Sequence, residues 1–478
     1  MNTEYEVIIG LEIHAQISSK TKMFCGCDND SFGKEPNTNV CPVCMGFPGM
    51  LPVPNKDAVE KGVKAALALG CEIPLHSKFD RKNYFYPDLP TGFQISQFDE
   101  PVSVKGQVTI QTEAGLKKVG ITRLHLENDA GKLTHTGPNT LLDYNRAGTP
   151  LMEIVSEPDM RSAKEARAYA EAIQKILRYT KSSDCDMEKG MMRFDASVSL
   201  RPMGENKLYP RAEIKNLNSF RSLEAAIEYE IKRQKKMWQA GAPLATEQTV
   251  GWDDERATTE LLREKESAAD YRYFPEPDLP PLEITPEQVE AWKATLPELP
   301  DAKHQRLMAE WGITEAEATF YVEDPTLADF FEAVARESKN PKSASAFVGT
   351  LLIKRLRDAN LSIENSPVSA QHLAQLIQLI DVGTISNNVA KSTVMDAMME
   401  SGKTPQAIVD EQGLAQVSDS SALEALCQQA IAENPVAAQD VKEGKMKAMG
   451  ALVGTVMKLS KGQANPQMVN TLLEKLLV

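Results

Sequence analysis

The chain is 478 residues long, which is enough for two or three domains, and 42% of its residues are hydrophobic, which is enough to form real cores. The formal net charge of −14 excludes a protein that coats nucleic acid without specificity, although it leaves room for a local basic patch. No apolar run approaches the roughly 20 residues of a membrane span, and the polar start of the chain is no signal peptide. We therefore expect a cytoplasmic protein that does not contact a membrane.

The first predicted strand, residues 7–17, has one apolar and one polar face. Apolar residues recur at every second position: Val7, Ile9, Leu11, Ile13, Ala15 and Ile17. The opposite face carries Glu12 and His14, a carboxylate and an imidazole two residues apart. On this strand alone, a solvated outer face explains these two residues as well as a functional site does.

Four of the seven cysteines lie in a loop-rich insert that follows this strand, at about residues 18–55. They form two closely spaced pairs, namely Cys25 with Cys27 and Cys41 with Cys44. In a reducing compartment such pairs favour a metal ion over disulfide bonds. Four thiolates complete the tetrahedral site of a structural zinc ion, so we expect structural Zn²⁺ here. Four free thiols in a loop are the alternative.

A helix is predicted at residues 57–69, and the segment that follows it at residues 79–88 mixes cations with aromatic rings. Arg81 and Lys82 precede three aromatic residues, at positions 84–86. Cations beside rings suit an anion or a nucleotide base. A surface strand that contributes its aromatic residues to the core explains the same spacing equally well.

Later strands repeat the division into an apolar and an ionic side. We predict such strands at residues 121–127, 151–157, 191–201 and 211–215, and a turn at 128–131. The ionic sides carry Arg123, Glu127, Glu153, Arg193, Asp195, Glu213 and Lys215. Antiparallel sheets often bury one face and leave the other wet, so neighbouring strands of this kind would gather acids and bases on one face. The order of the strands stays open at this point.

The remaining elements indicate how the chain is divided. Further helices are predicted at residues 162–179 and 222–240, and a proline-rich stretch at 271–300 suits a rigid, extended connector. Only helical patterns follow. The sequence predicts an α+β protein with an antiparallel β domain and flanking helices at residues 1–293, an all-α domain at 294–403 and a small all-α tail at 404–478.

The end of the tail is basic although the whole chain is acidic. Residues 441–478 contain six lysines and two glutamates, so the segment carries a net charge of +4. Such a segment is a candidate contact for a phosphate backbone. On charge alone, a solvated helical face is the simpler interpretation.

Familiar nucleotide and hydrolase motifs are absent from the sequence. It contains no GxxxxGK[ST] loop, no GxGxxG fingerprint and no GxSxG elbow. What remains is a carboxylate-rich strand face, which suits Mg²⁺ together with the phosphates of a nucleotide. By this reasoning His14 would support the metal ligands without binding the metal itself.

Motifs along the whole chain resemble the GatB/GatE family, the B subunits of tRNA-dependent amidotransferases. The resemblance rests on residues 10–14 (GLEIH), 79–87 (FDRKNYFYP), 123–132 (RLHLENDAGK), 145–150 (NRAGTP), 153–159 (EIVSEPD), 215–219 (KNLNS), 271–278 (YRYFPEPD) and 461–466 (KGQANP). It implies an antiparallel cradle domain, a helical domain and a tail similar to YqeY proteins that contacts tRNA.

The resemblance also implies a reaction. Glu misattached to tRNA(Gln), or Asp misattached to tRNA(Asn), is phosphorylated by ATP on its side chain, and ammonia then displaces the phosphate. A glutaminase partner, the A subunit of these enzymes, releases the ammonia from glutamine, and their C subunit completes the heterotrimer. The sequence leaves open which of the two tRNAs is the natural substrate.

Site residues follow from the family motifs. Glu12, His14 and Glu127 are expected to hold the principal Mg²⁺, with Glu153 beside them, so the resemblance promotes His14 to a ligand. Asp195 and Glu213 would bind further metal or guide ammonia and its proton. Phosphates would be contacted by Arg81, Lys82 and Lys215, whereas His125 is interpreted as structural or as a support for the metal ligands. The alternatives are a non-catalytic scaffold that binds tRNA and an ATP-dependent ligase that acts on a free amino acid.

Overall fold

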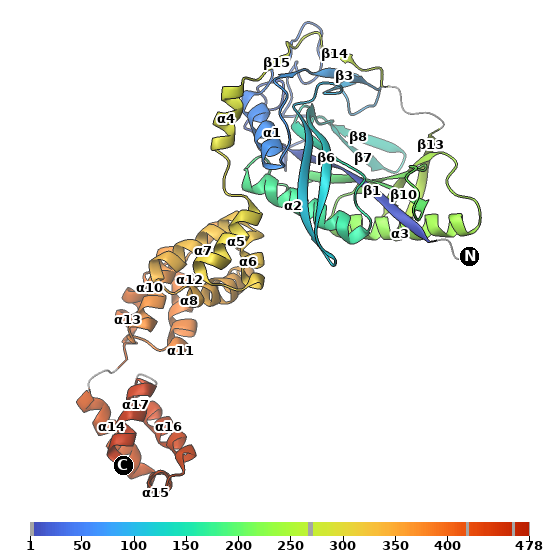
Figure 1. The fold of residues 1–478 in the computed structure, drawn as a ribbon. Helices are drawn as coiled ribbons and strands as arrows, with labels where there is room; N and C mark the ends of the chain where they lie inside the picture. The colour runs from blue at the N-terminus through green and yellow to red at the C-terminus, as the bar shows by residue number, and fades with distance from the viewer. Residues whose placement is uncertain (1–3, 266–270, 417–419, 461–463, 478) are drawn as a thin grey trace. The chain divides into compact units, whose positions relative to one another are not determined.

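The computed structural model forms two compact units, residues 1–300 and residues 301–478. It describes residues 4–265, 271–416, 420–460 and 464–477. The first unit mixes strands and helices, whereas the described part of the second unit is helical (Figure 1). Each unit has its own buried core.

A large twisted sheet forms the centre of the first unit (Figure 1). Its strands are, in spatial order, β13 (Thr258–Lys265), β12 (Glu247–Asp253), β11 (Ala212–Leu217), β10 (Met192–Pro202), β1 (Tyr5–Gln16), β9 (Pro150–Ser156), β6 (Gly115–Asn128) and β5 (Ser103–Thr112). Neighbours are antiparallel except β11 and β12, which are parallel. The expectation of a purely antiparallel sheet is therefore wrong at this pair. A helix connects β11 to β12, and parallel neighbours require such a crossover.

Three helices pack against the apolar side of this sheet. They are α1 (Lys56–Ala68), α2 (Ala163–Tyr179) and α3 (Phe220–Gln239), and α2 and α3 run along the underside of the sheet in Figure 1. The alternation predicted for the first strand holds, because Ile9, Leu11 and Ile13 are at most 1% exposed in the shared core. The other face of the central strands is therefore left to their polar residues.

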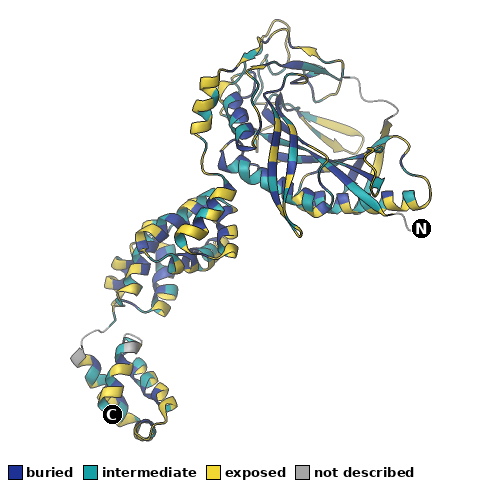
Figure 2. Ribbon diagram, in the orientation of Figure 1, coloured by how far each residue is buried: buried dark blue, intermediate teal, exposed yellow. Residues whose placement is uncertain are grey.

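Small sheets complete the first unit. The first contains β14 (Phe274–Pro275), β3 (Asp80–Asn83) and β4 (Phe93–Ser96), the second pairs β15 (Leu282–Glu283) with β2 (His76–Ser77), and the third is the hairpin of β7 (Lys132–Thr136) and β8 (Asn139–Asp143). Figure 2 shows this hairpin as largely exposed.

The proline-rich segment is not a free connector. Its β14 and β15 pair with strands formed by residues 76–83, and α4 (Pro286–Ala294) contacts α1. Proline tolerates such short edge pairings because it lacks only the N–H donor. The compact unit ends at Pro300. The domain boundary expected at residue 293 stays a prediction.

The second unit contains two separate clusters of buried side chains, which span residues 307–409 and 423–477. Its elements are α5 (Pro300–Trp311), α6 (Glu315–Val322), α7 (Pro325–Ser338), α8 (Pro341–Ser345), η1 (Ala346–Leu352), α9 (Ile353–Asp358), η2 (Ile363–Asn365), α10 (Ala370–Asp381), α11 (Asn387–Val389), η3 (Ala390–Val394), α12 (Met395–Ser401), α13 (Pro405–Gln412), α14 (Ser420–Glu433), α15 (Pro435–Lys442), η4 (Met446–Ala448), α16 (Met449–Leu459) and α17 (Pro466–Leu477).

The two clusters of buried side chains concern the domain boundary predicted at residue 404, because α13 begins at Pro405. Ile408 and Val409 of α13 belong to the first cluster, so α13 packs with the helices that precede it. The division of this unit into two domains stays a prediction. Of the six tail lysines, Lys461 lies outside the described residues. None of the helices in the described part of the chain is both long and apolar enough to cross a bilayer.

Candidate functional site: a carboxylate and imidazole cluster on the central strands

The pairing of β1 with its two neighbours gathers the ionic residues. His14 stands opposite Glu153 of β9 on one side and opposite Arg193 of β10 on the other. Glu12 stands opposite Asp195 in the same β1–β10 ladder. Directly opposed side chains have their Cβ atoms about 5 Å apart, so this register alone brings charged groups within contact distance.

Three of the four predicted Mg²⁺ ligands come together. One ligand atom each from His14, Glu127 and Glu153 lies within 4.8 Å of the other two. His14 Nε2 is 3.3 Å from Glu153 Oε2. His125 joins them, with its Nε2 3.4 Å from Glu153 Oε2 and 3.6 Å from Glu127 Oε2. The hydroxyl of Ser96 donates a hydrogen bond of 3.1 Å to Glu127. Two buried carboxylates and two imidazoles thus lie in one cluster.

The charges in this cluster compensate one another. Burial opposes the protonated form of His125, but Glu153 and Glu127 outweigh burial and raise the pKa of His125 to about 9. Burial would raise the pKa of Glu153, but His125 and His14 hold that pKa well below its usual range. The pKa of Glu127 is lowered against the effect of burial by His125 and Lys82. The cluster therefore holds carboxylates rather than carboxylic acids.

Glu12 differs from the other predicted ligands. Among the described residues, it does not belong to the group of ligand atoms that meet within 4.8 Å. Burial raises the pKa of Glu12, and the charges of Glu153 and Asp195 raise it further. The structure thus places Glu12 at the margin of the cluster, next to a small cavity that Ser197 and Arg211 also line.

A second group lies on the β10–β11 side. Lys215 Nζ is 2.8 Å from Asp195 Oδ2 and 2.7 Å from Glu213 Oε1. The two carboxylates outweigh the desolvation of the ammonium group and raise the pKa of Lys215. All three predicted residues are therefore neighbours, and Lys215 bridges the two acids.

Arg81 and Lys82 of β3, both predicted to contact phosphate, lie in different surroundings. Glu127 and Glu153 outweigh the burial of Lys82 and raise its pKa, and its Nζ lies 5.1 Å from the ring centre of Tyr271. Arg81 instead donates two hydrogen bonds, of 2.7 and 2.8 Å, to the buried carboxylate of Glu276. Neighbours on a strand point to opposite faces, which is why only Lys82 reaches the cluster.

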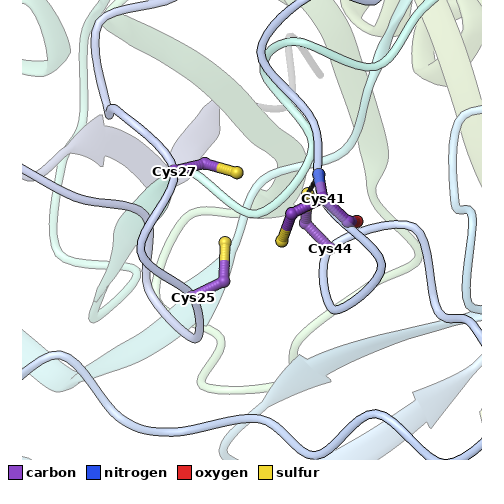
Figure 3. Close-up of side chains that lie close together, drawn as sticks. All are labelled: Cys25, Cys27, Cys41 and Cys44. Atoms are coloured by element: carbon purple, nitrogen blue, oxygen red, sulfur yellow. Dashed lines mark hydrogen bonds between the residues drawn. The ribbon is translucent and has the colours of Figure 1, made fainter.

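The four cysteines converge as predicted for a metal site (Figure 3). Their sulfur atoms all lie within 4.8 Å of one another, and none of the four forms a disulfide bond. A tetrahedral ion with bonds of about 2.3 Å to sulfur would place the sulfurs about 3.8 Å apart, so the quartet fits a metal ion. The buried ammonium of Lys22 points at Cys44 Sγ from 3.8 Å. The pKa of Cys44 falls to about 5, chiefly because the thiol of Cys25 hydrogen-bonds to it.

The sequence patterns do not identify Asp129 as a residue of this site, and they do not predict that His125 joins the cluster. Asp129 is 2% exposed and accepts hydrogen bonds of 3.3 Å from both terminal nitrogens of Arg193. Burial would raise its pKa, but Arg193 and Arg146 lower it to about 2. A signal is present in the sequence, because Asp129 continues the period-two series of Arg123, His125 and Glu127. The turn expected at residues 128–131 hides this signal.

Comparisons with known proteins agree with this architecture. The GatB/GatE catalytic domain family matches residues 7–290, and the GatB domain family matches residues 329–477. The B subunit of the aspartyl/glutamyl-tRNA(Asn/Gln) amidotransferase of Carboxydothermus hydrogenoformans is 48% identical over 475 residues and 98% of each chain. The protein of the same name from Persephonella marina is 49% identical over 475 residues, covering 99% of this chain and all of the relative. The chain therefore belongs to the GatB/GatE family of amidotransferase B subunits.

Proposed function

We propose that this chain is the component of the amidotransferase that activates and amidates misacylated tRNA. It phosphorylates the side-chain carboxylate of Glu on tRNA(Gln), or of Asp on tRNA(Asn), at the expense of ATP. Ammonia then replaces the phosphate to give the amide. The observation that carries the proposal is the carboxylate and imidazole cluster, in a chain that matches amidotransferase B subunits from end to end.

The residues of the cluster fit a magnesium ion. Octahedral Mg²⁺ with bonds of about 2.1 Å places its ligands about 3 to 4 Å apart, close to the spacing of the ligand atoms of His14, Glu127 and Glu153. These three residues would hold the ion, which when bound neutralises charge on the transferring phosphoryl group. Glu12 and the second imidazole, His125, would orient them.

The chain's own cations and acids would handle the substrates. Lys82, charged and half-buried near Glu127, would contact phosphate oxygens. Lys215 would hold Asp195 and Glu213 as carboxylates, which can accept a proton from ammonium or from the attacking amine. Arg81 would hold the β3–β14 edge in place through Glu276.

The remaining assignments concern structure and assembly. The cysteine quartet would bind Zn²⁺ as a structural ion, because four thiolates leave no open position for substrate. The glutaminase, or A, subunit of the enzyme together with its C subunit would complete a cytoplasmic heterotrimer. The basic tail would contact the tRNA backbone.

The test is an amidation assay with the three-subunit complex, ATP, Mg²⁺ and glutamine, on Glu-tRNA(Gln), Asp-tRNA(Asn) and free glutamate. We expect amide on one or both tRNAs and none on free glutamate. Glu127→Ala should abolish amidation and leave glutamine hydrolysis largely intact. Amidation of free glutamate would support a small-molecule ligase, and full activity of the Glu127→Ala complex would support a scaffold role.

A further inference from the structure

Arg193 lies on β10 directly across from His14, and the proposed function does not use it. Both of its terminal nitrogens donate to the carboxylate oxygens of Asp129, at 3.3 Å each. Even so, 34% of its side-chain surface is accessible, whereas Asp129 is only 2% accessible. The guanidinium is therefore fixed on one side by a buried carboxylate and open on another side, beside the ligand cluster.

Two guanidinium groups converge on the carboxylate of Asp129. Arg146 Nε lies 3.6 Å from Asp129 Oδ2, so this one carboxylate faces two guanidinium groups. On the β10–β11 side of the same face, Lys215 lies between Asp195 and Glu213. Arg193 thus presents a guanidinium group beside a cluster that contains buried acids, on the strand that faces His14.

Asp129 is held firmly in position by the backbone. Its N–H donates to the carbonyl of Thr149 at 2.8 Å, and its carbonyl accepts from the N–H of Gly148 at 2.9 Å. Gln16, on the end of β1, donates a further hydrogen bond of 3.3 Å to Oδ2. A buried acid with so many fixed contacts can orient an arginine, since the planar fork of arginine matches a carboxylate.

We propose that Arg193, positioned by Asp129, binds an oxyanion of the reacting substrates beside the His14–Glu127–Glu153 cluster. The inference rests on the proposed function and adds a residue to it. Two sources share the required chemistry: a phosphoryl oxygen of ATP and the side-chain carboxylate of the aminoacyl group. Arg193 would be a catalytic residue in direct contact with the anion, and Asp129 a positioning residue that acts through Arg193.

The test compares Arg193→Lys and Arg193→Gln complexes with wild type. We expect the KM for ATP or for Glu-tRNA(Gln) to rise by about 10- to 100-fold, since a charged hydrogen bond is lost. Equilibrium dialysis with ATP and filter binding with Glu-tRNA(Gln) measure the same loss without turnover. A rise in the KM for ATP alone identifies the bound oxyanion as a phosphoryl oxygen. A rise in the KM for the tRNA alone identifies it as the side-chain carboxylate of the aminoacyl group. Unchanged affinities for both substrates would overturn the inference.

The matched control is Arg201→Lys. Arg201 lies on the same strand, pairs with Glu6 at 2.7 Å, and is about 26 Å from Arg193 along β10. Its substitution should leave both affinities at the wild-type value. If the wild-type complex itself forms no amide on tRNA, the proposed function fails. If wild type is active and the Arg193 variants match it, only the present inference fails.

Asp129→Asn separates positioning from binding. We expect it to weaken binding of the same substrate that Arg193→Lys affects. The double variant should lose no more substrate affinity than Arg193→Lys alone, because both changes remove the same function. Losses that multiply in the double variant would contradict the positioning role. A wild-type melting temperature checks that this variant is folded.

Discussion

The polar residues of β1 have different roles because different strands face them. Glu12 meets Asp195, and burial beside like charges raises its pKa. His14 meets Glu153, which forms an ion pair with it at 3.3 Å. Two polar residues on the same face of β1 thus differ, because Glu12 lies at the margin of the cluster and His14 belongs to it. The distinction can be measured.

Glu127→Gln should raise the Mg²⁺ concentration needed for half-maximal amidation by at least about tenfold, because a ligand charge is lost. Glu12→Gln should shift this midpoint much less, since Glu12 lies outside the group of converging ligand atoms. The measurement is a Mg²⁺ titration of amidation, with Glu157→Gln at an exposed position as the control. An equal shift for Glu12→Gln and Glu127→Gln would show that Glu12 binds the ion as well.

A buried acid in the second unit should make that unit sensitive to low pH. Glu332 is 7% exposed and accepts hydrogen bonds of 3.0 and 2.7 Å from Arg306. Burial would raise its pKa, but Arg306 and Lys303 lower it below the ordinary value of 4.5. Its carboxylate therefore stabilises the fold fully above pH 4.5, and this contribution is lost as the pH falls through the lowered pKa.

Urea unfolding of the wild-type protein and of Glu332→Gln tests this. At neutral pH the variant should be the less stable of the two, and the difference should shrink below pH 4.5. The control is Glu310→Gln, because Glu310 is an exposed partner of the same arginine, at 2.8 Å, and such pairs contribute only about 0.3 to 0.5 kcal/mol. A Glu332→Gln difference that stays constant with pH would contradict the assignment.

At the scale of elements, the cysteine quartet supports the loop behind the site. A Cβ atom added at Gly148 would lie 3.4 Å from the Lys22 side chain and 3.5 Å from Cys44 Cβ, so these residues pack against the Gly148 backbone. Gly148 in turn donates its N–H to the carbonyl of Asp129. The quartet therefore packs against the backbone at Gly148, and Gly148 is hydrogen-bonded to the backbone of Asp129 beside the cluster.

Cys44→Ser should abolish bound zinc and lower the melting temperature of the first unit, because the metal no longer closes the loop. Zinc content by atomic emission and unfolding by calorimetry measure the two effects. Cys427→Ala removes a thiol from a separate cluster in the tail and should leave one zinc ion bound. Unchanged zinc content in the Cys44→Ser protein would refute the site.

At the scale of the whole molecule, the carboxylate and imidazole cluster and the basic tail lie in different units. The cluster of buried side chains at residues 423–477 shares no member with the cluster that ends at Val409. We therefore expect that the tail can be removed without opening the core that precedes it. This separation allows tRNA binding and chemistry to be tested apart.

Deleting residues 417–478 should raise the KM for Glu-tRNA(Gln) and leave phosphorylation chemistry possible at high tRNA concentration. Replacing Lys442, Lys447 and Lys458 with glutamine should have a similar, smaller effect and should flatten the salt dependence of binding. Filter binding at several salt concentrations measures both. Wild-type tRNA affinity in the truncated complex would contradict a role for the tail.

Sequence patterns alone predicted β1, β6, β9, β10 and β11 of the central sheet, their apolar faces and the cysteine quartet, but not β5, β12 or β13. Period-two alternation is local, so Ile9, Leu11 and Ile13 identify the buried face of β1 without knowledge of its partners. The short spacings of the cysteines likewise restrict where their sulfurs can lie. The family motifs supplied the reaction, which no strand pattern contains.

Only the tertiary structure decided which charges meet. The order β10–β1–β9–β6 and its register place His14 between Glu153 and Arg193, and a slip of one residue would turn every side chain to the other face. The same geometry sends Lys82 to the cluster and Arg81 to Glu276. These pairings join residues far apart in sequence, and contacts at that range depend on strand order, which a single sequence does not encode locally.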